Sequence, residues 1–280
     1  MDFFRGRLIS IITKHHKEQV MGAAFSKIPG LSWALLPDAD TDVLGTFTGE
    51  IARAGTQREA CIKKIALGSS LPGVDLLAAN EGAFGPHPAI PFAQADIELV
   101  MLYDTVSKQY WEAWEVSSDT NAFSAHVKNS AEGFEIARKH GFPEYGMVVL
   151  CRSGAQVYVV KKGIHDKQEL MDALFEAMNL KRGEVYLEAD LRAMHNPGRM
   201  KVIEKATQKL VENLMRECPS CAFPGYAVQE LETGLPCEWC GGETEGIKNY
   251  IYGCKSCGFS EKKPGEKTAM EAMYCPFCNP

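Results

Sequence analysis

The residues whose types and spacing most clearly predict chemistry are eight cysteines in the last 63 residues. Two thiolates separated by two residues can both reach one tetrahedral metal ion from a tight turn, and two such turns complete a four-cysteine site. Four consecutive pairs are not typical of a disulfide framework or of a redox motif. The pattern predicts two structural Zn²⁺ ions with no coordination position open for water. The predicted ligands are Cys218, Cys221, Cys237, Cys240, Cys254, Cys257, Cys275 and Cys278.

We call each Cys-x-x-Cys turn a knuckle and number the four knuckles in chain order. The spacing leaves two ways to pair them. Residues 249–254 are predicted to form a strand that leads into the third knuckle, as in a zinc-ribbon hairpin. This hairpin favours a nested pairing, in which the second knuckle joins the third and the first joins the fourth. A sequential pairing, first with second and third with fourth, is almost as well supported and stays open.

Residues 216–280 are predicted to form a separate double zinc-ribbon domain. This tail carries 6 basic and 9 acidic residues, so nucleic-acid binding is not expected. Docking of a protein partner, or a purely structural role for the tail, is favoured instead. Its aromatic residues Trp239, Tyr250, Tyr252 and Phe259 are expected to form a small core around the metal sites rather than a stacking platform.

Residues 1–215 are predicted to form an α/β domain with a mixed sheet, because strand and helix patterns alternate along them. Cys61 and Cys151 lie within apolar patterns, where buried packing is favoured over thiol catalysis. Strands are expected at residues 8–13, 74–79, 97–103, 110–116, 147–151, 156–160 and 184–190, and helices at 17–26, 56–67, 199–216 and from Asp166 onward.

Polar residues follow the first predicted strand, where α/β folds place their sites. Thr13, Lys14, His15 and Lys17 stand where the chain turns into a helix. Free N–H groups at a helix start, together with lysines, favour an anion such as phosphate. A solvated helix start is the alternative interpretation.

A second segment contains two separated carboxylates, Glu50 and Glu81, followed by Gly82. Mg²⁺ is commonly held by one or two carboxylates together with substrate phosphates, so these two residues are candidate Mg²⁺ ligands. Gly82 would allow the backbone to approach a ligand closely. The alternative is a surface loop of turn residues.

A third segment combines Arg192, His195, Asn196 and Arg199 at the end of the last strand of this domain. Two arginines, an imidazole and an amide suit recognition of a phosphate and a purine edge. A structural network of Asp190 with Arg192 or Arg199 is the competing interpretation.

Three motifs of the chain resemble the inosine/xanthosine triphosphatases and Ham-type non-canonical purine NTP pyrophosphatases. Residues 13–17 resemble the Thr-Asn-x-x-Lys start of that superfamily, with Lys14 in place of asparagine, residues 55–64 resemble its glycine-led helix, and residues 80–83 its Ile-Glu-Gly-Gly segment. The resemblance covers residues 8–88 and, more weakly, 184–210. The whole chain also resembles a bacterial family without established activity whose tail ends in Cys-Asn-Pro.

The triphosphatase resemblance implies an ITPase-like fold for residues 1–215 and a role for each matching residue. It implies that Lys17 contacts phosphate, that Glu50 and Glu81 hold Mg²⁺ or orient the attacking water, and that the 192–199 loop meets the base. It therefore favours a Mg²⁺-dependent pyrophosphohydrolase for a modified or deaminated purine nucleotide. A nucleotide sensor that signals to a protein partner through its ribbons, and a nucleic-acid-binding ribbon protein, are the alternatives.

The composition agrees with a globular chain. With 280 residues, 45% of them hydrophobic, and a net charge of −6, disorder, collagen and coiled coil are excluded as the main state. The apolar runs are too short to cross a bilayer, and no signal-peptide cleavage site follows the first apolar stretch. A cytoplasmic protein without membrane association is expected, with homodimerisation left open.

Overall fold

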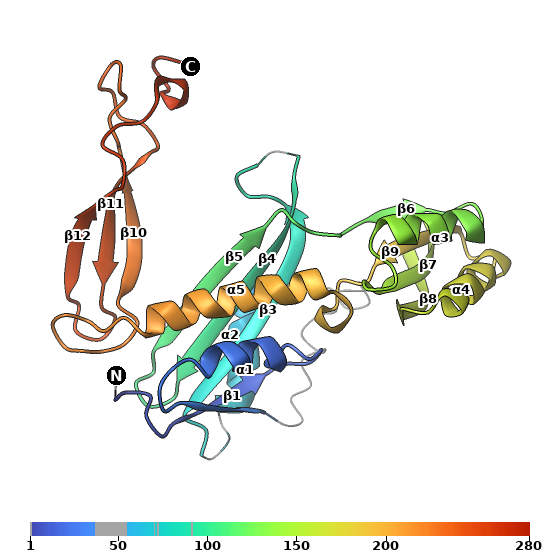
Figure 1. The fold of residues 1–280 in the computed structure, drawn as a ribbon, viewed down its shortest axis with the longest axis horizontal. Helices are drawn as coiled ribbons and strands as arrows, with labels where there is room; N and C mark the ends of the chain where they lie inside the picture. Colours follow the sequence, from blue (N-terminus) through green and yellow to red (C-terminus); the bar gives the residue numbers. More distant parts are fainter. Residues whose placement is uncertain (1, 37–54, 70, 72, 91) are drawn as a thin grey trace. The chain divides into compact units, whose positions relative to one another are not determined.

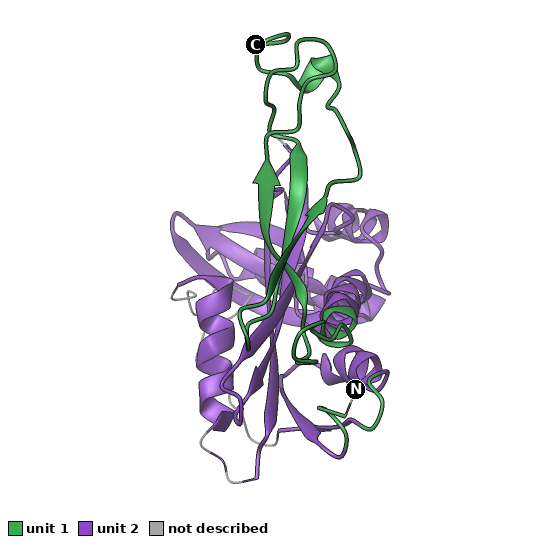
Figure 2. Ribbon diagram, turned by 90° about the vertical axis from the view of Figure 1, so that its left-hand side faces the viewer, with its two compact units in different colours: residues 1–5, 28–30, 211–280 green, residues 6–27, 31–210 purple. Residues whose placement is uncertain are grey.

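The chain folds into two compact units, which Figure 2 distinguishes by colour. The structure is a computed structural model and describes residues 2–36, 55–69, 71, 73–90 and 92–280. One unit contains residues 6–27 and 31–210, and the other contains residues 211–280 with the short segments 2–5 and 28–30.

The larger unit is built on a mixed five-stranded sheet with the order β2-β1-β3-β4-β5. The three strands β2, β1 and β3 are parallel, whereas β4 and β5 continue the sheet in antiparallel fashion. Helices α1 and α5 cover one face and α2 covers the other (Figure 1). The bounds are β1 Leu8–Ile12, α1 Glu18–Phe25, β2 Ser32–Leu35, α2 Gln57–Ser69, β3 Leu76–Pro86, β4 Gln94–Asp104, β5 Tyr110–Ser117 and α5 Pro197–Leu214.

The side-chain alternation of the central strands separates two interior layers. On one face, Leu77 and Ala79 of β3 pack with Cys61 and Ile65 of α2. The opposite face carries the intervening residues of β3 and is the side of α1 and α5. Cys61 is fully buried, as its apolar pattern predicts, and burial raises the pKa of its thiol.

Strand β3 is longer than the sequence pattern predicts. Residues 80–82, which follow the strand predicted at 74–79, continue this strand and pair with residues 98–100 of β4. The ladder of β3 with β4 extends from Leu76 opposite Asp104 to Pro86 opposite Gln94. Polar residues expected at a strand end therefore lie inside the sheet, where their side chains are buried.

A second, antiparallel sheet of the same unit has the order β6-β9-β7-β8 and is accompanied by α3 and α4. The expectation of a single mixed sheet is therefore corrected, and the short β6 and α3 were not anticipated. The helix start expected at Asp166 is confirmed, because its carboxylate caps α4 by accepting a hydrogen bond from the Glu169 amide at 3.0 Å. The bounds are β6 Ser124–His126, α3 Ser130–Lys139, β7 Met147–Ser153, β8 Gln156–Ile164, α4 Lys167–Asn179, β9 Glu184–Ala189 and the 3₁₀ turn η2 Ala193–His195.

The smaller unit contains a three-stranded antiparallel meander, β10-β11-β12. Its strands are β10 Ala227–Thr233, β11 Ile247–Gly253 and β12 Ser260–Pro264, and the 3₁₀ turn η3 spans Ala272–Tyr274. Tyr226, Tyr252 and Phe259 form a small core with Cys218 and Cys254. This confirms the expected packing of Tyr252 and Phe259.

Within the described part of the chain, no helix is both long enough and apolar enough to cross a membrane.

Candidate functional site

The eight predicted cysteine ligands form two groups of four. Within each group all four Sγ atoms lie within 4.8 Å of one another. The separations that the structure gives are 3.7 Å for Cys218–Cys257 and Cys221–Cys254, 3.9 Å for Cys237–Cys278 and 3.7 Å for Cys240–Cys275. A tetrahedron with metal–sulfur bonds of about 2.3 Å has edges of about 3.8 Å. Both groups are therefore compatible with a structural metal ion such as zinc.

The pairing of the knuckles differs from both arrangements that the spacing suggests. The first knuckle joins the third, at residues 218–221 and 254–257, and the second joins the fourth, at residues 237–240 and 275–278. The meander explains this result. Each strand connects one end of the sheet to the other, so consecutive knuckles fall at opposite ends and alternate knuckles share an end. We call the group of the first and third knuckles, which includes the knuckle that follows α5 in the chain, the proximal cluster. We call the group of the second and fourth knuckles the distal cluster.

A chain of buried polar side chains crosses the face of the five-stranded sheet that α1 and α5 cover. Lys17 donates from Nζ to Asn80 Oδ1 at 2.8 Å, and Asn80 donates from Nδ2 to Glu98 Oε2 at 2.8 Å. Glu98 Oε1 accepts from Arg199 Nε at 2.7 Å. Each of these four residues is at most 4% exposed. This series of hydrogen bonds connects Glu98 of β4 with Arg199 of α5, 101 residues later, and forms one ionic cluster in the interior of the unit.

Lys17 reaches this cluster from the turn between β1 and α1. His15 and His16, just before it, both have positive φ values (68° and 61°), a conformation uncommon for residues with a side chain. Burial lowers the pKa of Lys17 to about 7, with Arg199 and Lys64 contributing in the same direction and Glu98 and Glu81 opposing them. Lys17 is therefore a buried amine that exchanges its proton near neutral pH.

Gly82 has a different role from the one expected. It lies directly opposite Glu98 in the ladder, and a Cβ added to it would overlap the Glu98 carboxylate and the Arg199 guanidinium. The absence of a side chain therefore makes room for the buried ion pair rather than for an external ligand.

Glu81 points to the other face of the sheet, toward α2, because it alternates with Asn80 and Gly82 along β3. Its Oε1 lies 2.6 Å from Lys64 Nζ, and Lys64 also donates to the Asn80 carbonyl at 3.1 Å. Glu81 and Lys64 thus form a second buried ion pair beside the first cluster. Glu50, the other expected Mg²⁺ ligand, lies outside the described residues.

The 190–199 segment is held by its own hydrogen bonds. Arg192 forms an ion pair with Asp190, 2.6 Å from Nη2 to Oδ2, as the competing structural interpretation expects. Burial alone would raise the pKa of Asp190, but the Arg192 hydrogen bonds outweigh it and hold the pKa below its ordinary value. His195 Nδ1 lies 2.9 Å from His165 Nε2, and burial lowers the pKa of His195.

Asn196 caps α5 and connects the helix to the preceding loop. Its Oδ1 accepts from the Arg199 amide at 2.9 Å, which satisfies a free N–H of the first turn, and its Nδ2 donates to Asn121 Oδ1 at 2.8 Å. Arg199 also donates to the Leu191 carbonyl at 2.7 Å. The cap fixes the start of α5 and thereby the position of Arg199.

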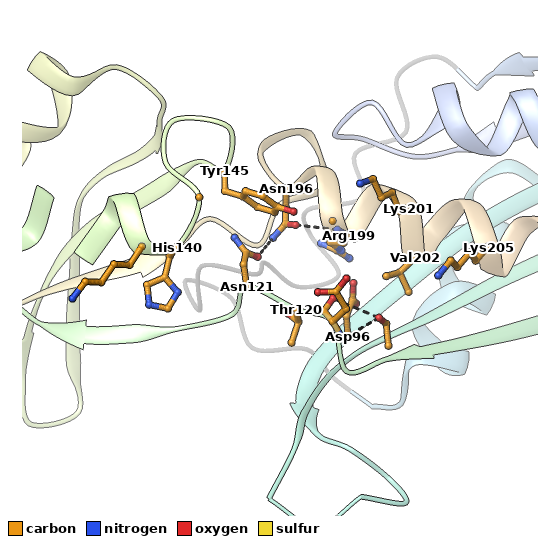
Figure 3. A pocket seen from close by; sticks show the side chains of 15 residues that line it. Asp96, Thr120, Asn121, His140, Tyr145, Asn196, Arg199, Lys201, Val202 and Lys205 are labelled. Carbon is orange, nitrogen blue, oxygen red and sulfur yellow. Dashed lines mark hydrogen bonds between the residues drawn. The ribbon is translucent and has the colours of Figure 1, made fainter. Parts of the chain in front are cut away.

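A cavity of about 400 Å³ opens beside Arg199 and Asn196 (Figure 3). The residues that line it come mainly from the β5–β6 connection, the end of α3 and the first half of α5. Basic side chains at the cavity are Arg199, Lys139, Lys201 and Lys205, acidic ones are Asp96 and Asp119, and Asn121, His140, Tyr145 and Asn196 add polar or aromatic groups. Among the described lining residues, none comes from the turn at Thr13, Lys14 and His15, where Thr13 Oγ1 instead donates to the Lys14 carbonyl at 2.8 Å.

Asp96 is the cavity residue with the most unusual environment. It is 1% exposed, and its Oδ1 has no hydrogen-bond partner among the described residues. It stands two residues before Glu98 on β4, so the two carboxylates share one face of the strand. Burial, followed by the nearby Glu98 charge, raises the pKa of Asp96 to about 8 despite the opposing Arg199.

Sequence reasoning missed the acidic half of this cluster. Asp96 and Glu98 alternate with apolar residues on β4, a pattern that reads as the solvent-facing side of a half-buried strand. The basic half of the cluster includes Lys17 and Arg199, which the sequence motifs singled out, but no pattern along α5 indicates that Arg199 faces an acidic partner on β4.

These features define an α/β protein with a buried ionic cluster beside a cation-rich cavity and with two four-cysteine groups at the ends of a small meander. The chain belongs to the DUF6671 family, described as a domain of unknown function, whose model matches residues 64–280. A comparison with curated proteins found no match.

Proposed function

We propose that this protein is a Mg²⁺-dependent nucleoside triphosphate pyrophosphohydrolase that acts on a modified or deaminated purine nucleotide. The observation that carries the proposal is the position of Asp96. Its buried carboxylate, with one oxygen unpartnered among the described residues, lines a cavity that four basic side chains also line. A buried unpartnered carboxylate is costly unless a cation or a proton balances it.

The charges at the cavity suit a polyphosphate. Lys201 and Lys205 are one helical turn apart on the exposed side of α5, and Lys139 approaches from α3. These three flexible ammonium groups can follow the phosphates of a bound nucleotide, whereas Arg199 is fixed at the inner end by Glu98. The cavity volume falls within the range of small-molecule sites.

Asn121 provides a group suited to a purine edge. Its Nδ2 is buried and has no hydrogen-bond partner among the described residues, while its Oδ1 is fixed by Asn196. An unpartnered amide donor favours a ligand with a carbonyl oxygen, as in a deaminated purine. His140, stacked on Phe123 with 3.8 Å between ring centroids, and Tyr145 add aromatic surface at the same cavity.

The residues present fit Mg²⁺ in the form in which it accompanies nucleotides. Mg²⁺ is typically bound by one or two protein carboxylates together with substrate phosphates and water. Asp96 would hold it, because Glu98 and Glu81 are engaged by Arg199 and Lys64. When bound, Mg²⁺ would neutralise phosphate charge and polarise the α-phosphoryl group.

The proposed reaction is attack of water on the α-phosphorus, with cleavage of the bond to the α–β bridging oxygen and release of a monophosphate and pyrophosphate. Arg199 would stabilise negative charge at the cavity wall, in a position fixed by Glu98 and the Asn196 cap. Lys17, connected through Asn80 and Glu98, would supply a positive charge that depends on pH.

We further propose that the two four-cysteine groups hold structural Zn²⁺. The sulfur separations match a tetrahedral zinc site, and amide groups point at the sulfurs, as from Ser220 to Cys218 and from Trp239 to Cys237, both at 3.4 Å.

The test is incubation of the full zinc-loaded chain with ITP, XTP, dITP, GTP and ATP in Mg²⁺ or Mn²⁺, with detection of both the monophosphate and pyrophosphate. We expect product from a deaminated nucleotide, a rate at least about 100-fold lower for Asp96→Asn, and little change for Asp172→Asn, an exposed residue of α4. No product from any nucleotide with either ion would overturn the hydrolase proposal.

Binding without turnover would instead favour a nucleotide sensor. The engagement of Glu81 and Glu98 in buried ion pairs is the observation that supports this alternative, because a carboxylate held by a cation is a weak base. Calorimetry with the same nucleotides separates the two outcomes.

A further inference from the structure

The two metal clusters present different residues at the tips of their knuckles. In the proximal cluster, the residue before the second cysteine of each knuckle is a serine, Ser220 or Ser256. In the distal cluster the same positions hold Trp239 and Phe277. All four tips are exposed, with Trp239 at 78% and Phe277 at 73%. The expectation that Trp239 belongs to a small core is therefore wrong.

The distal tips belong to a larger exposed apolar surface. Met273 and Tyr274, in η3 just before the fourth knuckle, are 60% and 58% exposed. Trp239 and Met273 line a depression of about 440 Å³ together with Glu238 and Glu271. Cys278, the residue after Phe277, also lines it, and the Phe277 ring lies against Gly242. We call Trp239, Met273, Tyr274 and Phe277 the distal apolar surface. Large aromatic side chains gathered in this way on a small module mark an interaction surface.

The charge around this surface indicates the chemistry of its partner. Residues 234–246 and 265–280, which build the distal end, contain five glutamates and one lysine. A Zn²⁺ ion with four thiolates adds a net formal charge of about −2. The corresponding proximal segments, residues 216–226 and 254–259, contain one glutamate, one arginine and one lysine. The apolar surface and the negative charge therefore coincide at the distal end.

We propose that the distal apolar surface is a docking site for a basic segment of a partner protein, in which lysine or arginine residues flank an apolar anchor. The anchor enters the depression between Trp239 and Met273, and the flanking cations face Glu238, Glu271 and the electron-rich indole. Nucleic acid is disfavoured because its phosphates would meet the same negative charge.

The test uses the full zinc-loaded chain and three labelled synthetic peptides of equal length. In the first, lysine alternates with leucine; in the second, glutamate replaces lysine; in the third, serine replaces leucine. We expect fluorescence anisotropy to detect binding of the first peptide alone, and added salt to weaken it. The double variant Trp239→Ser/Phe277→Ser, which gives the distal knuckles the tip residues of the proximal ones, should bind at least about tenfold more weakly.

Two controls keep the result specific. Ser220→Ala/Ser256→Ala changes the tips of the proximal cluster and should bind like the unmodified chain. Native mass spectrometry should find two zinc ions in both double variants. If Trp239→Ser/Phe277→Ser loses the zinc ion of the distal cluster, the single variants Trp239→Ser and Phe277→Ser serve for the comparison. Because no nucleotide enters the assay, its outcome is separate from that of the hydrolase test.

Several outcomes would overturn the proposal. They are equal binding of the lysine and glutamate peptides, unchanged binding by the Trp239→Ser/Phe277→Ser variant, or retention of single-stranded RNA at the distal surface. Self-association that this variant abolishes would show that a second copy, and not a basic segment, is the occupant.

Discussion

Arg199 and Glu98 form an ion pair from which solvent is excluded on both sides. Nε of Arg199 lies 2.7 Å from Oε1 of Glu98, and neither side chain is exposed. A pair of this kind adds little net stability over apolar residues, but the loss of one partner leaves a buried charge uncompensated. Arg199 also lines the cavity, together with Lys139, Lys201 and Lys205, and this position connects the stability of the fold to its proposed site.

Removal of one partner should therefore destabilise the larger unit strongly. We expect Glu98→Gln or Arg199→Met to lower the free energy of unfolding by about 3–5 kcal/mol, and the double variant to lose less than the sum of the two. Urea titration of the zinc-loaded proteins measures this. Arg138→Gln breaks an exposed pair with Glu135 and serves as the control, with a change near zero. Additive losses in the double variant would contradict the interaction.

Gly82 and Gly85 offer a matched comparison on one strand. A methyl group at Gly82 would overlap the Glu98 and Arg199 side chains, whereas no described residue has an atom within 4 Å of a Cβ at Gly85. We expect Gly82→Ala to lower the free energy of unfolding by about 1–3 kcal/mol and Gly85→Ala to change it little. The same urea titrations check this, and equal effects at both positions would show that Gly82 is not needed to accommodate the ion pair.

The lowered pKa of Lys17 predicts a pH dependence of stability. In the folded chain this pKa is about 7, against an ordinary value of 10.5, so between these values the unfolded chain binds the extra proton. The destabilisation caused by burying the charged ammonium group is complete below pH 7 and becomes smaller as the pH rises. Lys17 therefore contributes a positive slope of up to about 1.4 kcal/mol per pH unit to the free energy of unfolding. Arg199 and Lys64 strengthen the effect, whereas Glu98 and Glu81 reduce it.

Unfolding in urea at a series of pH values between 7 and 10 measures this slope. We expect Lys17→Met to remove Lys17's contribution, and Lys27→Met, an exposed residue after α1, to keep it. Parallel curves for all three proteins would show that Lys17 keeps its proton in the fold throughout this range.

The alternating pairing of the knuckles can be read from zinc stoichiometry. We expect Cys218→Ser/Cys254→Ser to lose one zinc ion, because both cysteines belong to the proximal cluster, and Cys218→Ser/Cys237→Ser to lose both. Native mass spectrometry gives the counts. A sequential pairing would reverse the two results, and a nested pairing would remove both ions from each variant.

The parts of this protein that depend on neighbours in the chain are predictable from the sequence. The Cys-x-x-Cys spacing identifies all eight members of the two clusters, because a tight turn by itself brings two thiolates together. The Asp166 cap and the two hairpins, β4 with β5 and β7 with β8, follow from side chains and turns a few residues apart. In each case the contact joins parts of one local segment: two thiolates of one turn, a cap and its helix, or two strands joined by a turn.

Only the tertiary structure decided which segments meet. Glu98 reads locally as a solvent-facing residue, and its burial depends on an arginine 101 residues later. Knuckle pairing depends on how many strands separate the knuckles, because each strand moves the chain to the opposite end of the sheet. Glu81 and Lys17 come from segments that sequence reasoning placed in one site, yet the alternation of β3 sends Glu81 and Asn80, the partner of Lys17, to opposite faces. Side-chain direction and long-range contact are properties of the assembled sheet, and no local pattern contains them.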